Sequence, residues 1–307
     1  MASDSTSRNY LKVKSLYFRL KSLAIFGISN KVFFKIPKIS LYYKVSLLKQ
    51  GRVVYKKTEN NEITGRNSVE EQNITSLKDF HLSHIDNWGV NWNQYSILTL
   101  QRQSLSRILY YNNLYKMILG VPGSILEFGS LWGATLSQLI SLRGMYEPYN
   151  YSRHIYGFDT FEGFVNTSKD KDGSHLSDGD YSVYEGYENQ LEEILILHEA
   201  NCPLPHIKKF SLIKGDASLT SKKWLKDNPH AIIAMAIFDM DIYQPTKDAL
   251  EAIIPRLTRG SILVFDELNC APFPGETQAL DEVLAINKLK LQHDPHQPNC
   301  AWTVWGD

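Results

Sequence analysis

The sequence predicts an α/β protein in which a mostly parallel sheet of seven strands lies between two layers of helices. Short apolar runs alternate with helical segments from Ser124 to the carboxyl terminus. Two of these runs, 232–238 and 261–265, end abruptly in acidic residues, and a helical segment separates them. Such a unit crosses over right-handedly, so its two strands are parallel and end at the same edge of the sheet.

The elements are predicted in order from their residue patterns. Segment 98–119 repeats apolar residues every three or four positions, which indicates an amphipathic helix leading into the main domain. Pro245 suits the first turn of the helix between the two acid-tipped strands, and Gly260 is expected to end that helix. The expected strands are 125–128, 154–158, 210–213, 232–238, 261–265, 289–292 and 301–304, and the expected helices are 134–145, 190–200, 221–227, 246–257 and 278–286.

The amino-terminal part differs in charge from the rest of the chain. The 307 residues carry 33 basic and 33 acidic side chains and no net charge. Residues 1–60, however, contain 13 Lys or Arg and two acids, so this segment is +11 and the remainder is −11. We expect a basic, aromatic extension and linker over 1–73, followed by the main domain over 74–307.

Three interpretations of the basic extension stay open. Its apolar and aromatic side chains alternate with lysines, so it can pack beside the main domain with the lysines in water. It can also lie on an anionic membrane surface through residues 8–57, or bind another polyanion. No DNA- or RNA-binding motif accompanies the charge, which argues against nucleic acid as a partner.

The sequence favours a cytoplasmic protein. No run of 18 apolar residues predicts a membrane-spanning helix, and the first residues lack the apolar core and cleavage site of a signal peptide. The cysteines are Cys202, Cys270 and Cys300. Because they are few, widely spaced and odd in number, we expect reduced thiols rather than a disulfide framework or a zinc site.

A long insert, residues 162–187, separates a strand from the helix that follows it. It is rich in Asp, Gly and Ser, and far exceeds the about 2 to 6 residues usual for such a connection. This predicts a lid over the site at the strand ends. The spacing of its acids does not match a calcium-binding EF-hand loop, so a mobile, solvated loop is the simpler expectation.

Acidic residues follow both strands around the central helix. Asp239 and Asp241 come after the first, and Asp266 and Glu267 come after the second. Ligands of open α/β sheets bind in the crevice at the carboxyl ends of the strands, so all four acids are expected to face one crevice. Four carboxylates there favour a hard divalent cation with oxygen ligands. Any one of these acids alone is explained as well by capping of the next helix.

The first strand runs into the sequence EFGSLWGA, which contains Glu127, Gly129, Ser130 and Gly133. Glycines at a strand-to-helix turn let a ligand approach the backbone, and the following helix amino terminus favours a negative group. The spacing is not the GxGxxG of dinucleotide-binding domains, which argues against NAD or FAD.

Two more acids extend this pattern along the sheet. Asp159 ends the second strand, where a carboxylate can accept both hydroxyls of a ribose, and Asp216 follows the third strand, where it can contact an adenine edge. An acid at each of three consecutive strands is the usual cradle for S-adenosylmethionine. Each acid alone has a second explanation as a helix cap.

Four motifs carry a resemblance to the macrocin O-methyltransferase family, metal-dependent sugar O-methyltransferases best known from antibiotic biosynthesis. They are VPGSILEFGSLWGA from Val121, YGFDTFEGF from Tyr156, FDMDIYQPTKDALEAIIPRLTRGSILVFDE from Phe238 and PGETQALDE from Pro274. The similarity extends roughly from Gln101 to the carboxyl terminus, and the third motif is the most specific. The resemblance implies a class I methyltransferase fold with a Rossmann-like sheet. It also implies S-adenosylmethionine bound by the 127–133 loop together with the acids of the second and third strands.

The same resemblance implies a metal site. Magnesium or a similar divalent cation is expected on Asp239, Asp266 and Glu267, although the related antibiotic enzymes usually carry Asp where this chain has Glu267. Asp241 falls at the family's general-base position. Relatives of this kind are commonly oligomers, so a homo-oligomer is also expected.

The expected reaction is methyl transfer from S-adenosylmethionine to a sugar hydroxyl of a glycan, nucleotide-sugar or glycosylated natural product. A sugar hydroxyl is a poor nucleophile while protonated, so a divalent cation that stabilises the alkoxide and a base, Asp241, are both useful. Two alternatives stay open. The triplet 239–241 also resembles the DxD of metal-dependent glycosyltransferases, although a second acid pair and the distant glycine-rich turn argue against that class. A non-catalytic binding protein with this fold is the other alternative.

Overall fold

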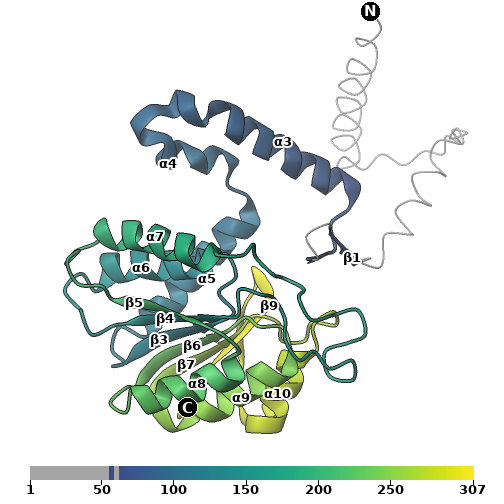
Figure 1. Ribbon diagram of the computed structural model, residues 1–307, viewed down its shortest axis with the longest axis vertical. Helices are drawn as coiled ribbons and strands as arrows, with labels where there is room; N and C mark the ends of the chain where they lie inside the picture. The colour runs from purple at the N-terminus through teal and green to yellow at the C-terminus, as the bar shows by residue number, and fades with distance from the viewer. Residues whose placement is uncertain (1–54, 59–61) are drawn as a thin grey trace, which may run out of the picture. The chain divides into compact units, whose positions relative to one another are not determined.

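The structure of the protein is a computed structural model that describes residues 55–58 and 62–307 (Figure 1). The chain divides into two compact units, residues 1–53 and 54–307. The basic extension, apart from residues 55–58, lies outside the described residues, so the interpretations of it stay predictions. Among the helices of the described part, none has the length and apolarity that crossing a bilayer requires.

Seven strands form the main sheet. They are β3 (Ser124–Phe128), β4 (Ile155–Asp159), β5 (Phe210–Lys214), β6 (Ile233–Phe238), β7 (Leu257–Phe265), β8 (Gln292–Asp294) and β9 (Gln297–Val304). Their spatial order is β5-β4-β3-β6-β7-β9-β8. Neighbours from β5 to β7 are parallel, whereas β9 is antiparallel to both β7 and β8. The predicted mostly parallel sheet of seven strands is therefore confirmed.

Helices cover both faces of this sheet (Figure 1). One layer contains α5 (Arg102–Met117), α6 (Ala134–Tyr146) and α7 (Tyr187–Ala200), and the other contains α8 (Ala217–Asp227), α9 (Tyr243–Ile253) and α10 (Gly275–Leu284). Alternate residues of β3 supply the two cores, with Ile125 packed in one and Leu126 in the other. Because both faces are buried, the central strands are apolar at nearly every position, which is why the sequence shows them as continuous runs.

The topology opens a crevice beside β3. The chain places β4 on one side of β3 and, after a reversal of direction across the sheet, β6 on the other. Such a switch point is where open α/β sheets bind ligands, outside the carboxyl ends of the strands. The predicted crevice therefore lies at the ends of β3, β4 and β6.

A row of stacked phenylalanines lies directly beneath this edge. Phe158, Phe128, Phe238 and Phe265 come from four adjacent strands, and their successive ring centroids are 4.6, 5.2 and 5.0 Å apart. None of the four is more than 1% exposed. The packing of this row therefore sets where, along the strand direction, the next residue of each strand reaches the crevice. Those next residues are Asp159, Gly129, Asp239 and Asp266.

One predicted helix end is wrong. Gly260 lies within β7 with φ +93°, and α9 already ends at Ile253, followed by the 3-10 turn η3 (Ile254–Arg256). The backbone N–H of Gly260 donates to the carbonyl of Trp305 at 2.9 Å. The glycine is therefore needed for a left-handed position within the strand and not for the end of a helix.

Part of the predicted linker is also helical. Helix α3 (Ser68–His84) begins with a capping box, in which the Asn67 side chain accepts from the backbone N–H of Glu70 at 3.0 Å and Glu70 accepts from that of Asn67 at 3.0 Å. The polar composition that suggested a linker is that of a helix whose side chains are not buried. The shorter elements nearby are β1 (Lys56–Lys57), β2 (Ile63–Thr64), η1 (Ile85–Asn91), α4 (Trp92–Tyr95) and η2 (Ser96–Thr99), and η4 (Ile286–Lys288) follows α10.

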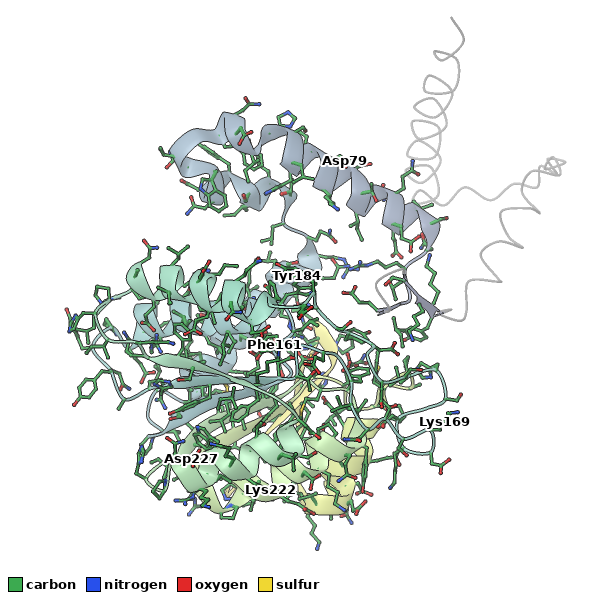
Figure 2. The ribbon with its side chains drawn as sticks, viewed as in Figure 1. Asp79, Phe161, Lys169, Tyr184, Lys222 and Asp227 are labelled. Atoms are coloured by element: carbon green, nitrogen blue, oxygen red, sulfur yellow. The ribbon has the colours of Figure 1, made fainter. Side chains whose placement is uncertain are left out.

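The insert 162–187 is packed against the domain, although Lys169 near its middle points outward (Figure 2). Asp172 is fully buried, and its two carboxylate oxygens accept from the backbone N–H groups of Tyr243 at 2.6 Å and Ser168 at 2.7 Å. The expectation of a mobile, solvated loop is therefore wrong for this part of the insert. Its role as a lid stays a prediction. A small apolar cluster beneath it contains Phe164, Leu176, Ile242, Cys270 and Phe273.

Candidate active site

A cavity of about 290 Å³ opens at the switch point. It lies near the lower end of the range of about 300 to 1,000 Å³ typical of small-molecule sites. Its wall comes from the β3–α6 turn, the end of β4, the insert, the turn after β5 and the loop after β6. Of the residues predicted to bind a cofactor, those that line the cavity are Glu127, Gly129, Ser130, Asp159 and Asp216.

The two glycines of the β3–α6 turn are required by the packing of the chain itself. Gly129 has φ +89°, and a Cβ atom there would collide with the backbone carbonyl of Asp239. Gly133 has φ +73° and precedes α6, and a Cβ atom there would collide with the side chain of Leu191. Gly133 does not line the cavity. Close approach of backbone to backbone, and of backbone to side chain, explains these glycines without a ligand.

Glu127 lines the cavity and has a buried carboxylate oxygen without a partner among the described residues. The residue is 1% exposed at the end of β3, and within residues 55–58 and 62–307 its Oε2 accepts no hydrogen bond. The hydroxyl of Ser130 is likewise buried and unpaired within these residues. Burial raises the pKa of Glu127 to about 8. Buried polar atoms are normally paired, so an orphaned acceptor on a cavity wall indicates a ligand that carries a donor, such as an ammonium group.

Asp159 already binds two backbone donors. Its Oδ2 accepts from the N–H of Leu131 at 2.7 Å and its Oδ1 from the N–H of Phe161 at 2.6 Å. Both donors sit at residues with positive φ, 45° and 57°, so this carboxylate holds the turns that follow β3 and β4. Each carboxylate oxygen has a further lone pair, which leaves room for ligand hydroxyls.

Asp216 caps the helix that follows β5. Its Oδ1 accepts from the backbone N–H of Ser218 at 2.8 Å, as the cap explanation requires. Its Oδ2 accepts from the side-chain amide of Asn166 at 3.3 Å, which brings the insert to this wall of the cavity. One oxygen therefore caps the helix, and the other contacts the insert.

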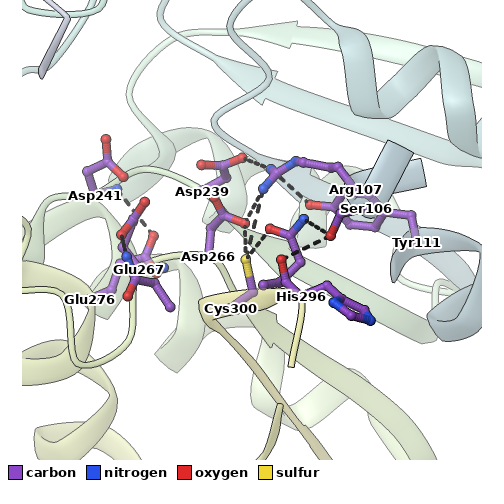
Figure 3. A network of polar contacts seen from close by, with 12 residues as sticks. Ser106, Arg107, Tyr111, Asp239, Asp241, Asp266, Glu267, Glu276, His296 and Cys300 are labelled. Atoms are coloured by element: carbon purple, nitrogen blue, oxygen red, sulfur yellow. Dashed lines mark hydrogen bonds and ion pairs between the residues drawn. The ribbon is translucent and has the colours of Figure 1, made fainter. Parts of the chain in front are cut away.

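Two of the acids after β6 and β7 share one positive charge, the guanidinium of Arg107 on α5 (Figure 3). Its Nη2 lies 2.7 Å from Oδ2 of Asp239, and its Nη1 lies 2.6 Å from Oδ1 of Asp266. The Nη2 atom also donates to the hydroxyl of Tyr111 at 3.2 Å. The two aspartates therefore converge on a single cation that belongs to the chain itself.

The other two acids lie together on the far side of this pair, beside Glu276 (Figure 3). Asp241 has φ +62°, and its backbone N–H donates to Oε1 of Glu276 at 3.2 Å. The backbone N–H of Glu267 donates to Oε2 of the same carboxylate at 3.1 Å. Within the described part of the chain, no three Asp, Glu, His or Cys side chains are arranged to hold a metal ion. The predicted metal ligands therefore stay a prediction.

Burial and repulsion between carboxylates raise the pKa values of Asp239, Asp241 and Glu267. Burial is the largest cause for Asp239, followed by repulsion from Asp266, and both hold its pKa well above the usual value. Burial also raises the pKa of Asp241, with repulsion from Asp239 next. The pKa of Glu267 rises to about 7 from burial and then from repulsion by Asp266. An added cation in this crevice would relieve the repulsion.

The three cysteines are free thiols, as predicted. Cys300 donates through Sγ to Oδ1 of Asp266 at 3.0 Å, and Asn299 donates to Sγ of Cys270 at 3.4 Å. Burial raises the pKa values of both Cys270 and Cys300, so these thiols stay protonated. Cys300 lies next to Asp266 and Cys270 next to Glu267, where a neutral thiol can orient the carboxylate.

The sequence interpretation missed Arg107, Asp172 and Glu276. Arg107 lies four residues before Tyr111, so both are on the buried face of an amphipathic helix. A charged residue on that face was the one sign in the sequence that Arg107 has a buried partner. Glu276 lies in the motif PGETQALDE, which was noted for the resemblance without a role for its glutamate. Nothing in the residue pattern distinguishes Asp172 from the other acids of the insert.

The strand order and the cavity at its switch point define a class I methyltransferase fold. A family model described as macrocin O-methyltransferase matches residues 107–292, which is more than half of the chain. The chain belongs to the macrocin O-methyltransferase family. The predicted resemblance and fold class are therefore confirmed, and the matched range contains all of the predicted site residues.

Solved structures agree with this assignment. A calicheamicin methyltransferase is 38% identical with a TM-score of 0.73, and the alignment covers 79% of this chain and 95% of that one. An apo structure described as TDP-rhamnose 3′-O-methyltransferase of calicheamicin biosynthesis is 36% identical with a TM-score of 0.68, covering 79% and 97%. The O-methyltransferase NovP, at 16% identity and a TM-score of 0.52 over 65% and 79% of the chains, shows likeness of fold alone.

One curated relative adds an acceptor of known kind. It is the 8-demethyl-8-(2,3-dimethoxy-α-L-rhamnosyl)-tetracenomycin-C 4′-O-methyltransferase of Streptomyces olivaceus, 28% identical over 153 residues. The match covers 48% of this chain, and the chain spans about half, 54%, of the length of that relative.

Proposed function

We propose that the protein transfers a methyl group from S-adenosylmethionine to a hydroxyl group of a sugar-containing acceptor. The observation that carries the proposal is one cavity that Glu127 and the acids after β6 line together. Glu127 offers a buried carboxylate oxygen that is unpaired among the described residues, and Asp239 and Asp241 line the same cavity. The acceptors named for two relatives, TDP-rhamnose and a rhamnosylated tetracenomycin, both support a sugar hydroxyl.

Three residues of the cavity wall are proposed to bind the methyl donor. Glu127 accepts from the ammonium group, because the residue lines the cavity and its Oε2 is buried without a partner among the described residues. Asp159 accepts from ribose hydroxyls with the lone pairs that its two backbone bonds leave free. Asp216 contacts the adenine edge beside the insert.

Asp239, Asp266 and Glu267 are proposed to hold a divalent cation such as magnesium. Their chemistry fits, because hard cations take carboxylate oxygens and two of these carboxylates already share one cationic partner. When bound, such an ion supplies positive charge that stabilises the acceptor alkoxide. Arg107 competes with any such ion for the two aspartates, so it is proposed to shift when the ion enters.

Asp241 is proposed as the general base. It lines the cavity, and burial followed by repulsion from Asp239 raises its pKa well above the usual value, which makes its carboxylate a stronger base. As the acceptor oxygen forms a bond to the methyl carbon, the bond from that carbon to sulfur breaks. The proton of the hydroxyl passes to Asp241, and S-adenosylhomocysteine leaves.

The test is transfer of a labelled methyl group from S-adenosylmethionine to TDP-rhamnose by the full chain. The expected result is label in an intact nucleotide-sugar, with one S-adenosylhomocysteine formed per methyl transferred. Release of free nucleotide without uptake of label would instead indicate the DxD glycosyltransferase and overturn the proposal. No label in TDP-rhamnose or in rhamnosylated polyketides, with S-adenosylhomocysteine still bound, would exclude this acceptor class.

The metal has a separate test in the same assay. EDTA is expected to abolish label transfer, because the acceptor alkoxide loses the positive charge that stabilises it. Added magnesium is expected to restore transfer. Full transfer in EDTA would exclude the metal role and leave the donor and acceptor assignments standing.

A further inference from the structure

We propose that Glu276 and Asp172 are positioning residues for Asp241. Together they hold the loop after β6 in the conformation that brings this carboxylate to the acceptor hydroxyl. The inference rests on the proposed function, in which Asp241 accepts the proton. Neither residue lines the cavity, so neither touches a substrate there.

Glu276 binds both acid-bearing loops through backbone donors. It is fully buried near the start of α10. Its Oε1 accepts from the N–H groups of Met240 at 3.1 Å and Asp241 at 3.2 Å, and its Oε2 accepts from the N–H of Glu267 at 3.1 Å. One side chain therefore ties the loop after β6 to the loop after β7 (Figure 3).

Asp172 holds the next donor along the same loop. It reaches from the insert, is fully buried, and accepts from the N–H of Tyr243 at 2.6 Å. Between them, two carboxylates bind the backbone N–H groups of Met240, Asp241 and Tyr243. Each contact joins a backbone donor of the loop to a buried side chain of another element, so together they restrain the loop.

The start of α10 packs directly against the loop after β6 and limits its movement. A Cβ atom on Gly275 would lie 2.5 Å from Oδ1 of Asp172, 2.5 Å from the backbone N of Tyr243 and 2.8 Å from the carbonyl of Asp241. Such distances show that helix, insert and loop touch without a gap. The loop therefore cannot move toward α10.

The conformation held in this way is one that the loop would not adopt unaided. Asp241 has φ +62°, in the left-handed region that side chains other than glycine rarely occupy. Such a residue persists only where its surroundings determine its conformation. The side chains of Glu276 and Asp172 supply those surroundings. The backbone conformation that they hold sets the direction in which the Asp241 side chain points.

The first variant is Glu276→Gln, which keeps the size of the side chain. Its amide NH₂ cannot accept a hydrogen bond, so at least one of the three backbone contacts is lost. We expect kcat to fall by about 10- to 100-fold, because small misplacements of catalytic groups cost rates of this order. The Kd for S-adenosylhomocysteine, measured by calorimetry, is expected to stay unchanged. The matched control, Glu251→Gln on the exposed side of α9, is expected to keep both values.

A double-mutant cycle separates positioning from general structural damage. If Glu276 acts through Asp241, Glu276→Gln lowers kcat in the parent chain but not in the Asp241→Asn background. An equal loss of kcat in both backgrounds, or no loss in the parent chain, would overturn the positioning role. Turnover at the parent rate in Asp241→Asn alone would instead show that the proposed base is wrong, which is a different failure.

Asp172→Ala repeats the test from the opposite side of the loop. This second variant keeps the inference testable if Glu276→Gln does not fold, and the melting temperature of Glu276→Gln shows whether it folds. The same pattern is expected, with kcat lowered in the parent chain, unchanged donor affinity and no further loss in the Asp241→Asn background. A fall in donor affinity with unchanged kcat would contradict the inference for this residue.

Discussion

Single residues of the crevice carry opposite electrostatic roles. Arg107 brings a positive charge to Asp239 and Asp266, whereas Glu127 keeps a carboxyl oxygen that is unpaired among the described residues. Both states are costly in the absence of ligands, because unpaired polar atoms and crowded charges are disfavoured in low dielectric. Binding of a cationic donor would relieve the cost at Glu127, and binding of a divalent cation would relieve the cost at the two aspartates.

Arg107→Gln tests the competition between the guanidinium and a divalent cation. Removing the chain's own cation is expected to tighten manganese binding by about tenfold, equivalent to roughly 1.4 kcal/mol, because Asp239 and Asp266 no longer have to release Arg107. Calorimetric titration of the full chain with manganese gives the Kd without an activity assay. Arg102→Gln on the exposed start of the same helix is the control. Weaker or unchanged binding in Arg107→Gln would contradict the competition.

Glu127→Gln tests the wall that is proposed to bind the donor. A hydrogen bond to a charged group contributes roughly 1.5–3 kcal/mol, so the Kd for S-adenosylhomocysteine is expected to rise by about 10- to 100-fold. Donor binding to the parent chain at pH 7 is also expected to release about one proton, because the carboxyl with its pKa of about 8 ionises beside the ammonium group. Calorimetry in buffers of different ionisation heats measures that proton. An unchanged Kd, or proton release that survives in Glu127→Gln, would contradict the assignment.

The same buried carboxyl gives the unliganded fold a pH dependence. The folded pKa of Glu127 lies near 8, above its usual value of 4.5, so the native state keeps a proton that the unfolded state loses. This contribution is fully present below the unfolded pKa and is lost as the pH rises towards the folded pKa. Glu127→Gln is expected to remove this part of the decline in stability.

At the scale of elements, the stacked phenylalanine row sets the positions of the acids. The strands β3, β6 and β7 end in a buried phenylalanine, and in β4 the phenylalanine is the last residue but one. The residues that follow form the rim of the crevice. Packing therefore determines the common height of side chains that come from separate parts of the sequence. The loops beyond the row then decide where each carboxylate points, which is the role proposed for Glu276 and Asp172.

Phe238→Ala is expected to lower the free energy of unfolding by about 3–5 kcal/mol, the range for removal of a buried aromatic side chain. Phe238 is fully buried and stacks on two neighbours, so the surrounding rings cannot fill the cavity without leaving their strands. Chemical denaturation gives the value, and Tyr149→Ala, at a residue that is 78% exposed, is the control. A loss no larger than that of the control would show that the row does not support the strand ends.

Much of the element order was predictable because buried parallel strands have a simple pattern. The apolar runs before Asp239 and Asp266 placed β6 and the end of β7 correctly, and their helical connection placed the acids at one edge. The start of β7 was not predictable, because Gly260 is equally typical of a helix end. The start of α10 was placed too late, because its first residues lack an apolar repeat.

The arrangement of the site was less predictable, because it depends on contacts between distant residues. Arg107 lies 132 and 159 positions from the aspartates that it joins, and no local pattern encodes such pairs. Glu276 lies 36 residues from Met240 and acts on backbone groups, which are the same at every position of a sequence. Sequence patterns therefore indicated which acids share an edge, but not which of them face each other.

At the scale of the whole molecule, the charge asymmetry separates two parts of the chain. Every described residue that lines the cavity belongs to the unit 54–307, whereas residues 1–53, most of the basic segment, belong to the other unit. Chemistry and the basic charge are thus carried by different stretches of sequence. The membrane-surface interpretation of the basic segment is the one that a simple binding experiment decides.

Removal of residues 1–53 is expected to leave the Kd for S-adenosylhomocysteine unchanged, because all the cavity residues that the structure describes are kept. Co-sedimentation with phosphatidylserine vesicles then compares the full and shortened chains. If the basic segment binds anionic surfaces, only the full chain sediments, and salt weakens the binding. Equal sedimentation of both chains would contradict a membrane role for this segment, and a loss of donor affinity would contradict the separation of the two units.

The most direct measurement is made on Asp241→Asn, with donor binding and methyl transfer determined on the same preparation. Because only proton acceptance is removed, calorimetry is expected to show unchanged affinity for S-adenosylhomocysteine, while label transfer falls by about 10²- to 10⁴-fold. Label transfer at the parent rate would contradict the proposal that the acids beside the donor cavity carry out the reaction.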